Sequence, residues 1–367
     1  MAKKFRGGNG GRLRELKAVD QKLRTGQLNR ELLEGIQGRI RRREPLSLTE
    51  SLSCLLARNS AFAGEKRSME SRGRGRILTI DVAGNIVTPD DPVFKDLLLT
   101  AATRMKGRGM LLNVGHVHCG AVNAAIDFES GKYNPETEDI RYVVEHVEGK
   151  NERENSMRQV QIASDLITKE LDVIPQAAAL YFDWETKDLE VLGYQADHNV
   201  DDEGVVPVMT HAARSWSNYI QSTRMEMAPQ YAHAIVISDP TTIMGNTEVE
   251  AVVVRCADAR EIILASGDSF SDPRTLFDAG PQELFLVSLR NGLIPQAGLG
   301  SIEYALLHVM GTLHIVIVDT NEEVAVNTRD LLVDSSEIVL NKIRSEDLEI
   351  TLLKYDPKAG TANIIFE

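Results

Sequence analysis

Two short motifs in the chain combine residue types that can hold a metal ion and move a proton. The segment Gly115–Gly120 (GHVHCG) places the imidazole of His116 and the thiol of Cys119 three residues apart, which suits two zinc ligands on one turn. The segment Cys256–Arg260 (CADAR) places a thiol, a carboxylate and a guanidinium at alternate positions. Side chains at alternate positions face one way in an extended segment. The arginine could then hold the carboxylate away from a metal and orient it to accept a proton.

Each motif alone also has a purely structural interpretation. His116 and Cys119 could be a hydrogen-bonded histidine beside a buried, inert cysteine, and Asp258 with Arg260 could form a surface ion pair beside Cys256. The flanking glycines favour a site, because glycine lets the backbone approach a ligand closely. His118 could be a further ligand, since its position does not decide which way its side chain points.

Both motifs directly follow apolar segments that are typical of buried parallel strands. These segments are Met110–Val114 and Val249–Arg255, and near-continuous apolar runs of this length indicate strands covered on both faces. Open α/β sheets place their ligands at the carboxyl ends of such strands. The sequence therefore predicts an α/β fold with the candidate residues at one edge of a sheet.

The chain also repeats a pattern of strands and helices after residue 76, which predicts two α/β domains with mostly parallel sheets. The first domain has an acidic insertion over residues 127–155, and the second has an additional strand, Val249–Arg255, at its start. We place the domains at 47–203 and 204–367. The matching segments are 77–89 and 284–295, 94–105 and 302–310, 110–114 and 313–318, 162–171 and 338–348, and 178–183 and 350–356.

A basic helical arm is predicted before the first domain, over residues 1–46. Leu13, Leu16, Val19 and Leu23 form an apolar stripe at helical spacing, and Pro45 ends the arm. Residues 1–76 carry 19 Lys and Arg against 8 Asp and Glu, a balance of +11, whereas the remainder carries 22 against 46, a balance of −24. Because aromatic residues for base stacking are not interleaved with these charges, no nucleic-acid partner is expected. The arm should lie on its own acidic body or on a partner subunit.

Length and composition define the broad class of protein. A chain of 367 residues with 43% hydrophobic residues is long enough for two globular domains. No apolar run approaches the roughly 18 residues that a membrane span needs, and no secretory signal follows the basic N-terminus. Three cysteines cannot build a disulfide framework, so a cytoplasmic protein with reduced thiols is expected.

Taken in order, the motifs resemble those of the β-class carbonic anhydrases. The first domain is similar to the later part of that pattern through Ala83-Gly84-Asn85 and Gly115–Val122, and Leu55–Phe62 is similar to the family's N-terminal helix. The second is similar to the earlier part. It contains Cys256–Arg260, Arg290-Asn291-Gly292 and Ser301–Ala305. The resemblance implies two β-carbonic-anhydrase-like domains packed as a pseudo-dimer.

Neither domain retains the family's full set of zinc ligands. The second has Thr320 and Glu323 where the family has histidine and cysteine. The first lacks the Cys-x-Asp-x-Arg strand, of which Ser68–Arg72 is at best a relic. Together they contain one set. The resemblance then implies that Cys256, His116 and Cys119 hold Zn²⁺, that Asp258 accepts a proton while Arg260 orients it, and that His118 is a candidate proton relay.

The activity implied by the resemblance is the reversible hydration of carbon dioxide to bicarbonate by a carbonate dehydratase. Two explanations fit the divided ligand set: the strand ending at Cys256 inserts into the first sheet, within this chain or in a partner, or both sites have decayed and the protein is a scaffold or sensor. Carbonyl sulfide and carbon disulfide are alternative substrates for the same zinc chemistry. The family also implies a homo-oligomer or an internal pseudo-dimer.

Overall fold

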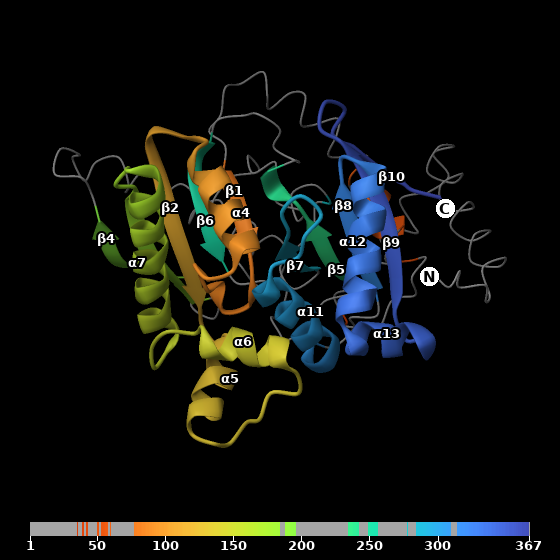
Figure 1. The fold of residues 1–367 in the computed structure, drawn as a ribbon, viewed down its shortest axis with the longest axis horizontal. Helices are drawn as coiled ribbons and strands as arrows, with labels where there is room; N and C mark the ends of the chain where they lie inside the picture. The colour runs from red at the N-terminus through yellow and green to blue at the C-terminus, as the bar shows by residue number, and fades with distance from the viewer. Residues whose placement is uncertain are drawn as a thin grey trace.

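The structure, a computed structural model, describes residues 77–183, 188–195, 234–241, 249–255, 284–309 and 314–366, together with 35, 39, 42, 50, 53–57, 59 and 277 (Figure 1). The predicted arm over residues 1–46 lies outside the described residues, apart from Gly35, Arg39 and Arg42. The motif Cys256–Arg260 also lies outside them. Within the described part of the chain, no helix is long and apolar enough to cross a membrane.

The described strands form two five-stranded sheets of the same design. The first sheet has the order β1-β6-β2-β3-β4 and the second the order β7-β5-β8-β9-β10. In each sheet four strands run parallel, and the last strand pairs antiparallel with its neighbour. The strands are β1 (Ile77–Asp81), β2 (Met105–His116), β3 (Gln176–Asp183), β4 (Asp188–Gln195), β5 (Ala234–Ser238), β6 (Val249–Arg255), β7 (Leu284–Ser288), β8 (His314–Asp319), β9 (Glu349–Asp356) and β10 (Thr361–Ile364). We call the part of the chain around each sheet the first unit and the second unit.

Equivalent turns follow the edge strands β1 and β7. Gly84 and Asn85 have φ values of 71° and 48°, and Asn291 and Gly292 have φ values of 51° and 78°. Glycine and asparagine are the residues that adopt this left-handed conformation most readily. The Asn and Gly residues that interrupt both strands in the sequence therefore form the same two-residue bend in both units.

The two strands between β4 and β7 are divided between the sheets. Val249–Arg255 was expected in the second domain, with its insertion into the first sheet as one explanation of the divided ligand set. The structure has this insertion within the chain, since β6 pairs with β1 on one side and with β2 on the other (Figure 1). β5, ten residues earlier, takes the corresponding place between β7 and β8. Residues 65–76 have a polar, glycine-rich sequence that does not favour a strand, whereas the sequence of β6 is rich in β-branched residues, which do.

Helices cover the sheets and define a core in each unit. In the first unit, α4, α5, α6 and α7 pack with β1 and β2 in one apolar cluster. In the second, α11, α12 and α13 cover one face of the sheet. The helices are α4 (Pro92–Ala102), α5 (Gly120–Glu129), α6 (Glu138–Glu145), α7 (Glu152–Leu171), α11 (Gln296–His308), α12 (Glu322–Ser335) and α13 (Glu337–Arg344), with the short 3-10 helix η1 at Ala83–Asn85.

Residues that precede the first sheet in sequence pack on the opposite face of the second sheet. Leu55 and Leu56 belong to the apolar cluster formed there by β5, β7, β8 and β9. Asn59 donates a hydrogen bond to the Gly360 carbonyl (3.1 Å) and accepts one from the Ala362 amide (2.7 Å). Leu55, Leu56 and Asn59, which precede β1 in sequence, therefore pack on the second unit.

The units meet along the edge strands β1 and β7 and through a helix crossing. The Asp81 amide donates to Ser288 Oγ and the Ala83 amide to Ser301 Oγ, each at 2.9 Å. α11 of the second unit crosses α6 of the first so closely that a Cβ on Gly300 would lie 2.1 Å from the carbonyl oxygen of Asp139. The crossing thus depends on a residue without a side chain at position 300.

Candidate functional site

His116 is the last residue of β2, and its side chain is fully buried. Nδ1 lies 2.9 Å from the carbonyl oxygen of Val117. A carbonyl can only accept a hydrogen bond, so Nδ1 carries the proton in this contact and Nε2 carries the lone pair of the neutral ring. Metal-binding histidines commonly have this arrangement, in which a backbone carbonyl fixes the ring and the other nitrogen faces the metal.

Cys119 is also fully buried, and it is the N-cap residue of α5. Its side chain makes no capping hydrogen bond. The N-terminus of a helix favours negative charge, which suits a thiolate. Between the two residues, His118 adopts a left-handed conformation (φ 55°) and its side chain is exposed. The turn therefore buries His116 and Cys119 and leaves His118 at the surface.

The strand exchange places the end of β6 beside the end of β2 at this edge of the sheet. In the pairing of β2 with β6, Val114 is the partner of Arg255. Gly115 and His116 follow on β2, and Cys256 is the residue after Arg255. Cys256, Asp258 and Arg260 lie outside the described residues, and within the described part of the chain no three His, Cys, Asp or Glu side chains form a metal-binding group.

A buried polar network holds the end of β2 against η1 and α7. Asn85 donates to Asn113 Oδ1 (2.6 Å), and Asn113 Nδ2 donates to the Asn85 carbonyl (2.9 Å). Asn155 donates to the Gly84 carbonyl (2.8 Å), and Ser156 lies 2.9 to 3.0 Å from the Asn113 and Leu180 carbonyls. Such a network makes a region rigid when its members are satisfied. Asn113 precedes His116 by three residues, so the network fixes the strand that presents the histidine.

The glycines of the motif make room for neighbouring elements, which differs from the role expected from sequence. A Cβ on Gly115 would lie 3.0 Å from the Glu152 carbonyl oxygen at the start of α7. A Cβ on Gly120 would lie 2.5 Å from the hydroxyl oxygen of Tyr304. Tyr304 comes from α11, so the second unit places a hydroxyl directly against the residue after Cys119.

Next to this contact lies a titratable cluster that the sequence analysis did not identify. The rings of Tyr304 and His308 are 4.7 Å apart, and His308 Nε2 lies 3.3 Å from Glu136 Oε1. Tyr133 donates a 2.6 Å hydrogen bond to Glu136. Burial and the hydrogen bond to Glu136 raise the pKa of Tyr133. Burial alone would raise the pKa of Glu136. The hydrogen bond from Tyr133 and the nearby His308 outweigh this effect, so the pKa of Glu136 is lowered. The i, i+4 spacing of Tyr304 and His308 could have indicated this pair from the sequence. Their partners Tyr133 and Glu136 could not be found in that way, because they come from the distant insertion in the first domain.

The corresponding edge of the second sheet holds an ion-pair cluster instead. Ser238 pairs with Val318 as Arg255 pairs with Val114, so Asp239 stands where Cys256 follows β6. Asp239 is fully buried and accepts hydrogen bonds from Thr241 N (2.8 Å), Thr241 Oγ1 (2.6 Å) and Asn291 N (2.9 Å).

Two arginines complete this cluster. Arg290 Nη1 lies 3.7 Å from Asp239, and Arg290 Nε donates a 2.6 Å bond to Asp96 on α4 of the first unit. Arg104 donates to the Thr241 carbonyl at 2.8 Å; burial lowers its pKa, and the charge of Asp239 opposes that shift. Burial, together with the charge of Asp239, raises the pKa of Asp319 at the end of β8. This edge of the second sheet therefore links the two units through side chains.

A comparison with protein-family models matches residues 65–200 to the model described as carbonic anhydrase. The match covers β1 to β4 and includes His116 and Cys119. No curated protein matches the chain. The resemblance seen in the motifs of the first unit is thus confirmed over residues 65–200, which match the carbonic anhydrase family model.

Proposed function

We propose that the chain catalyses the reversible hydration of carbon dioxide to bicarbonate at one zinc site, built from both motifs. The observation that carries the proposal is the position of β6 between β1 and β2. This pairing makes Cys256 the residue that follows the strand next to His116, as the divided ligand set requires. We infer that the two units are divergent copies that pack as a pseudo-dimer and share this site.

The described residues fit a zinc ion. His116 has a neutral tautomer with its lone pair on Nε2, and Cys119 is a buried thiol at a helix N-terminus. A third ligand from Cys256 would complete a site with three protein ligands, the number that catalytic zinc sites use. Zinc bound there supplies a Lewis acid that activates water at neutral pH.

The remaining roles follow from the chemistry of the side chains. Asp258, held by Arg260, would accept the proton that the attacking water loses. Tyr304 would close the site on the side of the second unit, since its hydroxyl lies against Gly120. His118, exposed next to the buried ligands, would pass the proton to solvent. The second unit would contribute structure and no zinc of its own, because Asp239 in the corresponding place is held by hydrogen bonds and arginines.

The test is zinc per chain in the wild type and in the variants Cys256→Ser, Cys119→Ser and Cys54→Ser, with carbon dioxide hydration measured on the same samples. About one zinc per chain is expected in the wild type, as one tetrahedral site requires. The first two variants should lose zinc and activity. Cys54→Ser is the matched control, because Cys54 is a buried cysteine in the segment that packs on the second unit.

The outcomes separate the alternatives. No zinc in wild-type protein purified with the metal present would contradict the shared site and leave the scaffold or sensor. Loss of zinc in Cys119→Ser with full retention in Cys256→Ser would contradict the role of β6. Zinc without carbon dioxide hydration, but with hydrolysis of carbonyl sulfide or carbon disulfide, would change the substrate and keep the site.

A further inference from the structure

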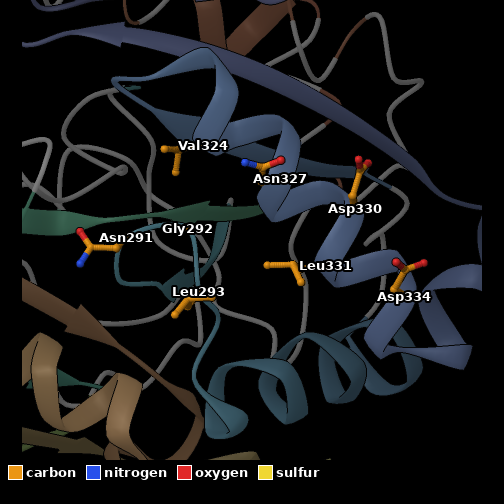
Figure 2. A pocket seen from close by; sticks show the side chains of 8 residues that line it. All are labelled: Asn291, Gly292, Leu293, Val324, Asn327, Asp330, Leu331 and Asp334. Carbon is orange, nitrogen blue, oxygen red and sulfur yellow. The ribbon is translucent and has the colours of Figure 1, made fainter. Parts of the chain in front are cut away.

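A cavity of about 430 Å³ lies in the second unit between the turn at Asn291–Leu293 and helix α12 (Figure 2). Leu293 contributes from the turn and Leu331 from α12, and the two side chains are 48% and 44% exposed. Leucine side chains this exposed on facing elements leave apolar surface in contact with water. The other lining residues are Gly292, Val324, Asn327, Asp330 and Asp334.

In the first unit, helices fill the corresponding space. A Cβ on Gly84, in the equivalent turn, would lie 3.3 Å from Ala121 of α5 and from Val147, which follows α6. His146, also just after α6, accepts a 2.7 Å hydrogen bond through its carbonyl from Gln159 of α7. The segment from α5 to Val147 thus packs against the turn, which α7 also contacts through the Asn155–Gly84 hydrogen bond.

The second unit has no counterpart of that segment between β8 and α12. Thirty-five residues, 117–151, separate β2 from α7 and form α5 and α6, whereas only Thr320 and Asn321 separate β8 from α12. α12 takes the place of α7 against the turn, since Thr328 Oγ1 donates to the Gly292 carbonyl at 3.0 Å. The cavity therefore adjoins the turn whose equivalent in the first unit is covered by α5 and by Val147, at the end of the segment that contains the amphipathic helix α6.

The charge of the cavity identifies the kind of helix that would fit. Its acidic side chains, Asp330 and Asp334, lie on α12, and no Lys, Arg or His is among the described residues that line it. Arg329 pairs with Asp330 at 2.7 Å, which leaves the cavity with an acidic side at Asp334. Residues 12–24 of this chain have an apolar stripe and carry five basic and two acidic residues, a balance of +3. An amphipathic basic helix complements both the leucines and the carboxylates.

The residues that follow the predicted arm in sequence pack on the second unit. Leu55 and Leu56 pack on the second sheet, and Asn59 bonds its β9–β10 hairpin. Twenty-eight residues separate Arg24 from Ser53, and they would span about 40 Å even if wholly helical. Leu55 and Leu56 lie on the face of the second sheet opposite α12, so this linker has to pass around the sheet to bring residues 12–24 to the cavity.

We propose that residues 12–24 of this chain dock as a helix in the cavity between the 291–293 turn and α12. Leu13, Leu16 and Leu23 would cover Leu293 and Leu331, and the basic residues would face Asp330 and Asp334. The docked helix would cover the turn of the second unit, as the segment that contains α6 covers the equivalent turn of the first. This inference does not depend on zinc binding.

The experiment is hydrogen exchange of residues 12–24 in the full-length chain. Asp330→Lys with Asp334→Lys should accelerate exchange of this segment at least about tenfold, because local opening governs exchange. The matched control is Asp127→Lys with Glu129→Lys, the same charge change on exposed positions of α5. Adding Arg14→Glu and Lys17→Glu to the cavity variant should restore protection. Zinc content should be the same in all four proteins, which separates this test from that of the shared site.

Three results would overturn the proposal. One is rapid exchange of residues 12–24 in the wild type, equal to that in the cavity variant. Another is slow exchange that the cavity variant leaves unchanged. Protection that disappears on dilution would place the arm of a second molecule in the cavity and would overturn docking within the chain.

Discussion

Gly115 and Gly120 flank the His116–Cys119 turn, and each leaves room for a helix. At Gly120 the neighbour is the hydroxyl of Tyr304, which would lie 2.5 Å from an added Cβ. The contact joins the residue after a candidate zinc ligand to the second unit. The surroundings of the His116–Cys119 turn are therefore determined by the helices that pack against it as well as by its own sequence.

Replacement of Gly120 by alanine should therefore destabilise the protein by about 1–3 kcal/mol through overpacking. Combining it with Tyr304→Phe, which removes the clashing oxygen, should recover part of that loss. The free energy of unfolding in urea for the wild type, both single variants and the double variant measures the coupling. Equal costs of Gly120→Ala with and without the hydroxyl would show that the two residues do not interact.

Individual site residues were partly predictable. His116 and Cys119 could be found because their spacing is a local property, and the first unit matches the carbonic anhydrase model over residues that include both. Asn113, Asn155 and Ser156 could not be found, because their hydrogen bonds join three separate elements. The glycines were predicted to admit a ligand, but at these two positions the structure places a helix backbone and a tyrosine.

Strands and helices as elements were largely visible in the sequence, but the sheet to which each strand belongs was not. β5 and β6 are both short, apolar and rich in β-branched residues, and ten residues separate them. Nothing local tells which of two similar strands enters which sheet, because pairing depends on the vacancy left by distant strands. The assignment of β6 to the second domain failed for this reason.

The crossing of α6 and α11 gives a test at the scale of elements. Gly300→Ala would place a Cβ 2.1 Å from the Asp139 carbonyl, and a backbone atom cannot move aside as a flexible side chain can. We expect a loss of about 3 kcal/mol or more in the free energy of unfolding. Gly193→Ala on β4, where a Cβ meets nothing within 4 Å, is the control and should change stability little. A similar small effect at Gly300 would show that the helices can separate without cost.

On the scale of the whole molecule, the cluster around Asp239 and Arg290 connects the units. Arg290 contacts Asp239 in the second sheet and Asp96 on α4 of the first unit. Asp239 is fully buried, so removing Arg290 weakens the compensation of its charge and leaves the hydrogen bonds from Thr241 and Asn291 and the charge of Arg104. The cluster occupies the place that corresponds to the proposed shared site in the first sheet.

Arg290→Met should cost about 3–5 kcal/mol, the usual effect of breaking a buried pair. Adding Asp239→Asn should recover part of the loss, since the amide carries no charge and its oxygen still accepts from Thr241, although its nitrogen cannot accept from Asn291 N. Calorimetry measures both the stability and the number of unfolding transitions. We expect the wild type to unfold in one transition and Arg290→Met to separate the units into two. An unchanged single transition at the wild-type temperature would contradict the connecting role of Arg290.

The position of β6 in the first sheet has a consequence for folding of the protein during its synthesis on the ribosome. β1 and β2 emerge first, but the strand that joins them ends at Arg255, roughly 140 residues after His116. At 5–20 residues per second, this means a delay of about 7–28 s during which both strands expose unpaired edges. Folding of the first sheet therefore waits for synthesis of most of the chain, and the nascent protein depends on protection from aggregation throughout that interval.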